Sequence, residues 1–437
     1  MNGEKTIPTP WRERILKREF EVVLGKMLQP EQKNSDETEE PYLRSANVQW
    51  EGVDLSDVKT MWFSPKEKKE LLLKPGDLLV NEGGDVGRCA IWAGGIEACY
   101  FQNAINRVRA LWKASARFLY YWLYNVKHAG FIDAIVARTT IAHLTAEKLE
   151  AVPWPDAPPT EQKRIAAYLD ASCAAIDAAV AAKRRQIETL DALRKTTITH
   201  AVTRGLDPEA PLVTSKQDWL ADIPSHWTAL CLKRLLREPL TYGLNEAAEL
   251  EDRDFPRYLR ITDFDDNGSL RHDTFRSLPR EIARGAMLEP DDVLFARSGA
   301  TVGKTFMFRD YEGEACFAGY LICARTMPWK LSALFLYHFT KTTVYEAWKN
   351  LIFTQATIQN ISAAKYNYLA IPLPPLPEQR AICDFVERKN SDYSNLSTQI
   401  QRQIETLLAY RKSLIHECVT GQRRISEADV NRVQVHG

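Results

Sequence analysis

The sequence lacks an excess of charge of either sign. Lysine and arginine together number 57, aspartate and glutamate also number 57, and the formal net charge at pH 7 is zero over 437 residues. A protein with a uniformly basic surface binds DNA non-specifically through many phosphate contacts, and the equal numbers of basic and acidic residues exclude such a surface here. Local basic patches remain possible, so any binding of nucleic acid must come from the arrangement of the charges.

The sequence also lacks the patterns that build disulfide scaffolds, zinc sites and membrane spans. Its eight cysteines include no Cys-x-x-Cys pair, and its eight histidines include no His-x-x-x-His pair. No run approaches about 18 uninterrupted apolar residues, and the charged start has no apolar segment typical of a secretion signal. We therefore expect a cytoplasmic protein with no metal site and no membrane partner.

An internal repeat organises the chain. At a shift of 217 residues, Arg-Gln-Ile-Glu-Thr-Leu at 185–190 recurs at 402–407. At a shift of 216, Tyr-Leu-Arg at 42–44 recurs at 258–260. A six-residue identity inside such a collinear set is very unlikely by chance. The chain is thus interpreted as two copies of one unit, each a variable body followed by a well-matched tail.

Each tail is predicted to be one long helix. Thr160 can cap the first tail, and Gly205 ends it. The apolar residues of the two tails recur at helical spacing, at strict seven-residue intervals in the second, and are Ile165, Leu169, Ile176, Val180, Ile187 and Leu190, then Val386, Tyr393, Ile400, Leu407 and Leu414. Such seams are typical of coiled coils, so we expect the tails to pair with each other or to dock a partner. The alternative is that each helix packs only on its own body.

Each body is predicted to be mixed α and β. At 77–92 and at 292–308, two short apolar runs are separated by a segment that contains glycine, a pattern typical of strand–turn–strand units. A helical stretch follows, for example at 116–126. Proline-rich segments close both bodies, because proline stops strand pairing and sets an extended path into the tail.

No catalytic motif is complete. Residues 298–305 read Ser-Gly-Ala-Thr-Val-Gly-Lys-Thr and end like a phosphate-binding P-loop, but Ser298 stands where the first glycine belongs. The equivalent stretch 83–89 lacks both the phosphate lysine and the magnesium hydroxyl. The two copies share only a glycine turn and a basic residue, Arg88 or Lys304. We therefore interpret the element as structural or ligand-facing and the chain as non-catalytic.

The order and spacing of several motifs carry a family resemblance. They are Pro-Leu-Pro-Pro-Leu-Pro-Glu-Gln at 372–379, its weaker copy at 158–162, the two Arg-Gln-Ile-Glu-Thr-Leu tails, and the linker Gly-Leu-Asp-Pro at 205–208 with Trp219 and Trp227. Over nearly its whole length, the sequence resembles the specificity subunits of Type I restriction–modification systems (the HsdS family). This resemblance implies an α+β fold in which two mixed α/β target recognition domains are separated by two long antiparallel coiled-coil helices, with pseudo-two-fold symmetry.

The resemblance also implies a division of the chain and a set of partners. The segments expected are target recognition domain 1 (1–155), the central conserved helix (156–204), a linker (205–226), target recognition domain 2 (227–375), the distal conserved helix (376–424) and a tail (425–437). The partners implied are double-stranded DNA, two modification subunits that use S-adenosylmethionine to methylate adenine, and restriction subunits that hydrolyse ATP. No cofactor is expected on this chain.

Candidate DNA contacts are basic, amide, hydroxyl and aromatic residues of the bodies. Arginine can donate two hydrogen bonds to guanine, asparagine can form two with adenine, and lysine or arginine can bind phosphate. They are Tyr42, Arg44, Asn81 and Arg88 in body 1, and Tyr258, Arg260, Arg271, Arg276, Arg297, Ser298 and Lys304 in body 2. Positions that recur in both bodies favour framework or phosphate contact over base reading.

Two other functions remain open from the sequence alone. The duplicated helices could form the rod of a structural or assembly protein whose bodies bind protein. An NTPase built on 298–305 is a third hypothesis, which a Lys304→Ala variant would test.

Overall fold

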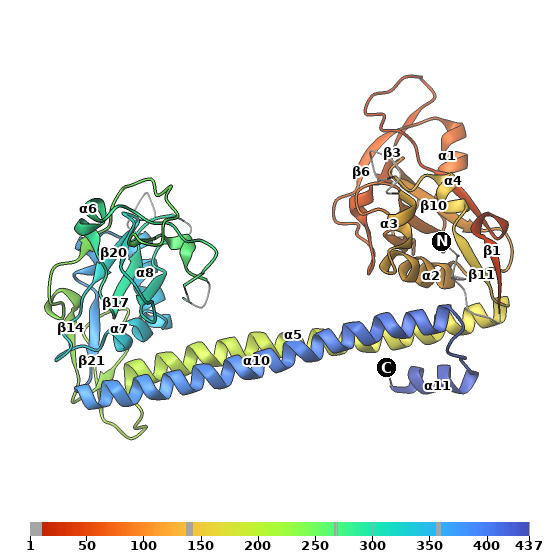
Figure 1. The fold of residues 1–437 in the computed structure, drawn as a ribbon. Helices are drawn as coiled ribbons and strands as arrows, with labels where there is room; N and C mark the ends of the chain where they lie inside the picture. The colour runs from red at the N-terminus through yellow and green to blue at the C-terminus, as the bar shows by residue number, and fades with distance from the viewer. Residues whose placement is uncertain are drawn as a thin grey trace. The chain divides into compact units, whose positions relative to one another are not determined.

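The computed structural model describes residues 11–136, 143–265, 268, 270–299, 301–354 and 360–436. The chain divides into two compact units, Met1–Lys183 with Gln401–Gly437 and Arg184–Ile400. Each unit contains one body, one end of the first long helix and the opposite end of the second (Figure 1). Each compact unit therefore combines one body with parts of both tails, so the boundary between the units does not coincide with the boundary between the two sequence copies.

Body 1 is built from short strands and four helices in the described residues. In chain order they are β1 (Arg12–Ile15), β2 (Phe20–Leu24), β3 (Thr38–Leu43), β4 (Val48–Gln49), β5 (Gly52–Val53), β6 (Lys59–Phe63), α1 (Pro65–Leu71), β7 (Leu78–Asn81), β8 (Cys89–Ile91), β9 (Tyr100–Phe101), β10 (Ile105–Ala110), α2 (Ala116–His128), α3 (Phe131–Val136), α4 (Ala146–Glu150) and β11 (Pro153–Asp156). The central sheet has the antiparallel order β2-β10-β7-β8. Beside it, β3 pairs in parallel with β9, and β1 pairs with β11.

The core of body 1 lies between this sheet and α2. The helix begins after Ser115, whose hydroxyl accepts a hydrogen bond from the Phe118 amide at 3.2 Å. Phe118 and Phe20 each meet the ring of Trp154 edge-on, at centroid distances of 5.5 and 5.1 Å. These three rings are buried and join α2, β2 and β11 into one core.

Body 2 repeats this architecture. Its elements are β14 (Thr228–Cys231), β15 (Thr241–Tyr242), β16 (Arg257–Leu259), α6 (Arg280–Ala283), β17 (Asp292–Ala296), β18 (Thr305–Phe308), β19 (Ala315–Phe317), β20 (Leu321–Ala324), α7 (Ala333–Phe339), α8 (Thr343–Thr354), α9 (Ala363–Tyr366) and β21 (Ala370–Leu373), after the linker strands β12 (Leu212–Val213) and β13 (Ile223–Pro224). The sheet order β15-β20-β17-β18, the parallel pair β16–β19 and the closing pair β14–β21 match their counterparts in body 1, which in addition has β6 beside β3 and the pair β4–β5. The internal repeat is therefore confirmed as a repeat of topology.

A buried ion pair is part of the repeated framework. Asp77, before β7, accepts hydrogen bonds from the guanidinium of Arg109 at 2.6 Å. Asp292, at the start of β17, accepts hydrogen bonds from Arg325 at 2.9 to 3.2 Å. Each carboxylate also accepts a backbone amide three residues earlier, at 2.7 and 2.8 Å. The two bodies thus share internal polar contacts as well as strand order.

The two tails are long helices, as predicted: α5 spans Pro159–Arg204 with 46 residues, and α10 spans Leu376–Val419 with 44. At about 1.5 Å per residue, each is roughly 65 to 70 Å long. A further helix, α11 (Glu427–His436), lies where the sequence predicts only a tail.

The helices pair in an antiparallel sense. In the first unit, Arg411 of α10 lies 3.4 Å from Asp177 of α5. In the second unit, Arg194 of α5 donates to the Asn390 side chain of α10 at 2.8 Å. An early part of α5 thus meets a late part of α10, and the reverse also holds. The alternative in which each helix packs only on its own body is wrong.

The predicted seam residues lie on the packed faces of the helices. Six are buried, namely Ile165, Leu169, Ile176, Val180, Val386 and Leu414, and the other five are half-buried, namely Ile187, Leu190, Tyr393, Ile400 and Leu407. The pattern follows from the sequence spacing, because a seven-residue interval returns a side chain to nearly the same helix face.

The alanine-rich helix α5 also has the length and composition of a membrane span. One 18-residue window reaches a mean hydropathy of 1.5. Its largest apolar side chains, including Ile165, Leu169 and Ile176, are buried against protein. Because an apolar helix face inside a soluble core passes the same test, this window is accounted for by the helix pairing and the body contacts.

Candidate functional site

The recurring tyrosines and one asparagine among the candidate DNA contacts lie inside the bodies. Tyr42 and Tyr258 are buried, and the Tyr258 hydroxyl donates to the Leu244 carbonyl at 2.7 Å. Asn81 is fully buried, and its amide donates to the Ser45 carbonyl at 3.1 Å. These three side chains do not face solvent, so the structure favours a framework role for all three, as recurrence suggested for the two tyrosines.

The recurring arginines Arg44 and Arg260 hold the same local turn. The Arg44 amide donates to the Asn47 side chain at 2.9 Å, and the Arg260 amide donates to Asp263 at 2.6 Å. Each guanidinium is half-buried and pairs with a carboxylate, Asp57 at 2.6 Å in body 1 and Asp263 at 2.9 Å in body 2. Their repeated intramolecular partners point to a structural role.

The glycine turns that resemble a P-loop are explained by backbone geometry. Gly87 and Gly303 have φ of 82° and 79°, a region that favours glycine. A Cβ on Gly303 would also lie 2.2 Å from the Lys349 side chain. In body 1, Arg88 turns inward, 3.6 Å from Asp85 and 3.4 Å from the Ser45 carbonyl. The shared feature is thus a tight turn.

Two further candidate arginines of body 2, Arg271 and Arg276, lie at its surface. Arg271 pairs with Asp273 at 2.8 Å, and Arg276 pairs with Glu251 at 2.5 Å. All four side chains are substantially exposed. Exposed pairs of this kind contribute little stability, so such an arginine can exchange its carboxylate for a phosphate at small cost.

One aromatic and cationic cluster stands at the end of the central sheet of body 2. Arg297 follows β17, and its guanidinium lies 4.9 Å from the ring of Tyr242 at the end of β15. Tyr320 precedes β20, is exposed, and its carbonyl accepts the Arg297 amide at 3.0 Å. Ser298 bridges to Asn360 beside this cluster. Arg297 and Ser298 are among the predicted DNA contacts, whereas both tyrosines were missed, because only strand pairing brings them to this place.

Body 1 carries different residues at the corresponding sheet end. In the strand register, Leu24 takes the place of Tyr242, because Leu24 pairs with Asn106 as Tyr242 pairs with Ile322. Ala104 takes the place of Tyr320 and Glu82 that of Arg297, because the Glu82 amide donates to the Ala104 carbonyl at 2.9 Å as the Arg297 amide donates to the Tyr320 carbonyl. The strand frame is therefore the same in the two bodies while the side chains at this end differ.

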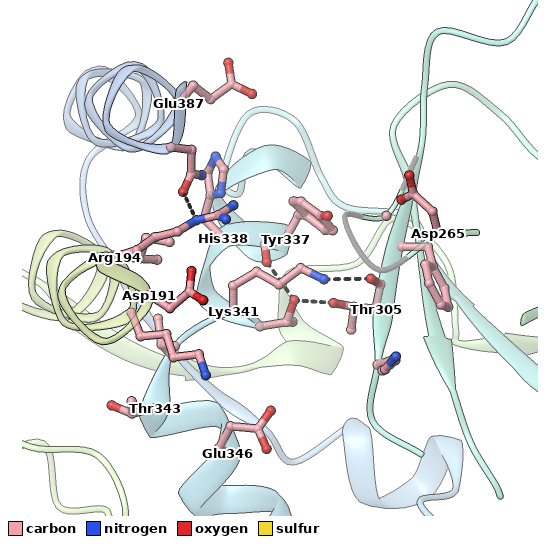
Figure 2. A pocket seen from close by; sticks show the side chains of 18 of the residues that line it. Asp191, Arg194, Asp265, Thr305, Tyr337, His338, Lys341, Thr343, Glu346 and Glu387 are labelled. Carbon is pink, nitrogen blue, oxygen red and sulfur yellow. Dashed lines mark hydrogen bonds between the residues drawn. The ribbon is translucent and has the colours of Figure 1, made fainter. Parts of the chain in front are cut away.

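A cavity of ≈ 820 Å³ lies inside the second unit, between body 2 and both helices (Figure 2). Its lining from α5 and α10 includes Asp191, Arg194, Lys195, Glu387 and Asn390. Its lining from body 2 includes Lys304, Thr305, Arg309, Tyr337, His338, Lys341 and Glu346. The cavity thus offers cations and carboxylates together, with Lys304 the one predicted DNA contact that it contains.

Lys341 is the central cation of this cavity. Its ammonium donates to the Thr305 carbonyl at 2.8 Å and lies 4.4 Å from the ring centre of Tyr337 (Figure 2). Burial, reinforced by the nearby charges of Lys304, Lys349 and Arg194, lowers the pKa of Lys341 to about 8. Burial likewise lowers the pKa of the neighbouring His338 to about 4.

The equivalent positions of the first unit hold hydrogen-bonded aromatic residues. Tyr121 and Tyr124 stand where body 2 has His338 and Lys341. The Tyr121 hydroxyl donates to Asp170 of α5 at 2.7 Å, and Arg411 of α10 donates to the Tyr124 hydroxyl at 3.0 Å. The side chains that join body and helices here thus differ between the two units.

No group of three or more histidine, cysteine, aspartate or glutamate side chains able to hold a metal occurs among the described residues. All eight cysteines are free thiols, and seven of them are buried.

The chain matches known proteins over both copies of the repeat. The sequence model of the Type I restriction modification DNA specificity domain matches residues 8–189 and 285–406. The specificity subunit of the Type I restriction enzyme EcoBI from Escherichia coli is 22% identical over 438 residues, covering 97% of this chain and 88% of the relative. The EcoKI specificity subunit from Escherichia coli strain K12 is 23% identical over 188 residues, 42% of this chain and 40% of the relative.

Two solved structures share the fold. A chain from work on complex assembly and conformational transition of the type I restriction–modification system aligns with a TM-score of 0.71 at 16% identity, covering 94% of this chain and 98% of that one. The HsdS subunit from Thermoanaerobacter tengcongensis aligns with a TM-score of 0.55 at 17% identity, covering 95% and 98%.

Proposed function

The chain belongs to the Type I restriction–modification DNA specificity family, and from that premise we propose how it selects DNA. It is a non-catalytic DNA-specificity subunit. Each body reads one half of a bipartite, asymmetric target, and the paired helices set the unread gap and dock the modification subunits. The observation that carries this proposal is the strand frame that the two bodies share, combined with different side chains at one sheet end.

The cluster at the sheet end of body 2 supports a reading role. Arginine can donate two hydrogen bonds to guanine, and a tyrosine beside it supplies both a hydroxyl and an apolar face. Half-buried Arg297 and the exposed Tyr242 and Tyr320 combine these groups at one sheet end. Because the corresponding residues of body 1 differ, the two bodies would select different bases.

The proposal includes partners that act on the DNA. Two modification subunits carry S-adenosylmethionine and methylate adenine, and restriction subunits that hydrolyse ATP join them. The chain itself holds no cofactor and works in the cytoplasm. The alternative of a structural rod with protein-binding bodies is not favoured, because the family match covers the bodies as well as the helices.

Mapping of methylated adenine tests this function. Genomes of cells with and without the gene are compared, and we expect one added motif with two specified halves and an unread gap. An Arg297→Ala variant should relax the half of the motif read by body 2 and leave the other half unchanged. A continuous palindromic motif, or no added motif beside active modification subunits, would contradict the proposal.

The role of the helices is tested by paired insertions. Seven residues are inserted after Ala182 in α5 and seven before Gln401 in α10, which leaves Asp177–Arg411 and Arg194–Asn390 each within its own unit. Seven residues preserve the seam and lengthen each helix by about 10 Å, or roughly three base pairs. The preferred gap should grow accordingly. A four-residue insertion at the same places is the mismatched control, and an unchanged gap preference for the seven-residue variant would argue against the spacer role.

A further inference from the structure

Two exposed tryptophans occupy equivalent places in the two bodies. Trp112 and Trp329 are related by the same 217-residue shift as the helices, and each is followed by lysine. Trp112 is 76% exposed and Trp329 is 62% exposed. Large aromatic side chains bury much apolar area when they can, so two such exposures at one repeated position need a physical reason.

Large apolar side chains that recur because the fold needs them are buried, and these two tryptophans are not. The recurring pairs Leu43 with Leu259 and Phe118 with Phe335 are fully buried. The reading surfaces, in contrast, are exposed and differ between the bodies. A large aromatic side chain that is both repeated and exposed is neither a core residue nor a reading residue. These are the properties expected of a residue that binds the same kind of partner surface in each body.

The surrounding backbone fixes both tryptophans in the same way. Trp112 stands three residues before Ser115, whose amide donates to the Gln162 side chain of α5 at 2.8 Å. Trp329 stands three residues before Ser332, whose amide donates to the Gln379 side chain of α10 at 2.8 Å. Each tryptophan therefore occupies the same place relative to the start of a long helix.

We propose that Trp112 and Trp329 are the aromatic anchors through which the chain binds two copies of one modification subunit. The inference rests on the proposed function, which requires two such partners. Interface hot spots are enriched in tryptophan, and a repeated anchor presents equivalent surfaces to identical partners. Duplex DNA is a poorer occupant, because its stacked bases leave no free ring faces for an inserted indole unless the duplex is kinked.

The test measures assembly of the full chain with the modification subunit of the same system. Wild-type protein is expected to bind two modification subunits, as measured by sedimentation. Trp112→Ala and Trp329→Ala should each weaken one site by roughly thirtyfold and leave one subunit bound, and the double variant should bind neither tightly. Trp112→Phe and Trp329→Phe should recover part of the affinity. Because both side chains are exposed, the thermal midpoints of the variants should match the wild type.

Exposure-matched controls separate an anchor from any exposed apolar residue. Met27 is 75% exposed and Tyr368 is 65% exposed, and the repeat places Asn245 and Ala151 at their counterparts. Met27→Ala and Tyr368→Ala should leave binding of the modification subunit unchanged. Equal weakening by these controls would overturn the proposal.

Three other outcomes would also overturn it. They are unchanged two-to-one assembly by the double tryptophan variant, loss of DNA affinity by the variants in the absence of modification subunit, and self-association of the wild-type chain that the variants abolish. Failure of the proposed function is a distinct result, because wild-type complexes would then assemble but methylate no bipartite motif.

Discussion

The Gln379 side chain joins the start of α10 to the body before it. Its oxygen accepts a hydrogen bond from the Ser332 amide at 2.8 Å, and its amide donates to the carbonyls of Lys330 and Pro374 at 2.8 and 2.9 Å. The side chain is fully buried. Gln162 repeats this arrangement with Ser115 and with the Ala157 carbonyl. The repeated Glu-Gln motif thus includes a clamp between helix and body.

Replacing Gln379 by leucine should destabilise the second unit by about 3 kcal/mol, because three backbone groups, two partly and one fully buried, lose their partners. Urea unfolding followed by circular dichroism measures the change. Gln403→Leu, on the exposed face of the same helix, is the control and should alter stability by less than about 0.5 kcal/mol. Equal effects of the two substitutions would show that the clamp is unimportant.

His338 should make the second unit sensitive to acid. Burial lowers its folded-state pKa to about 4 from 6.5, and its Nε2 has no hydrogen-bond partner among the described residues. The unfolded chain therefore binds the proton first, and stability falls as pH drops from about 6.5 to 4, by at most about 3 kcal/mol. His338→Phe should flatten this slope in urea melts across that range. His272→Phe, at an exposed position, should keep the wild-type slope, and a slope unaltered by His338→Phe would refute the assignment.

Lys341 should cost stability at neutral pH. Burial lowers its pKa from 10.5 to about 8, so the folded state holds this charge less favourably than the unfolded state below pH 8, by up to about 3 kcal/mol. Lys341→Met should raise the urea midpoint at pH 7, after allowance for the lost hydrogen bond to Thr305. The advantage should shrink between pH 8 and 10.5. A lower midpoint for Lys341→Met at pH 7 would contradict this account.

The clustered residues at the sheet end of body 2 should affect DNA selection more than folding. Tyr242→Ala removes the ring that lies 4.9 Å from the Arg297 guanidinium, and the hydroxyl that accepts the Ala363 amide at 2.9 Å. Tyr242→Phe removes only the hydroxyl and is the matched variant. We expect about 1 to 3 kcal/mol less discrimination against wrong bases in the body 2 half-site for Tyr242→Ala, measured by competition binding of the assembled complex. Equal loss of affinity for every DNA sequence would indicate phosphate contact instead.

The candidate contacts show where sequence reasoning stops. The repeat identified Tyr42 and Tyr258, but a recurring residue can be framework or site, and only burial separates the two. Tyr320 was missed, because nothing in its local sequence distinguishes an exposed tyrosine from a core one. Its place beside Arg297 depends on β20 pairing with β17, a contact between segments separated along the chain.

The sequence by itself determined the duplication, the two long helices and their apolar seams, since helical periodicity and self-similarity are local properties of the chain. The tertiary structure decided which residues face solvent, which is a consequence of long-range strand pairing and helix packing. It brought Arg297 and Tyr242 to one sheet end, buried Asn81, and left Trp112 and Trp329 exposed at matching positions. Exposure is a property of the whole packed unit, so no local pattern could supply it.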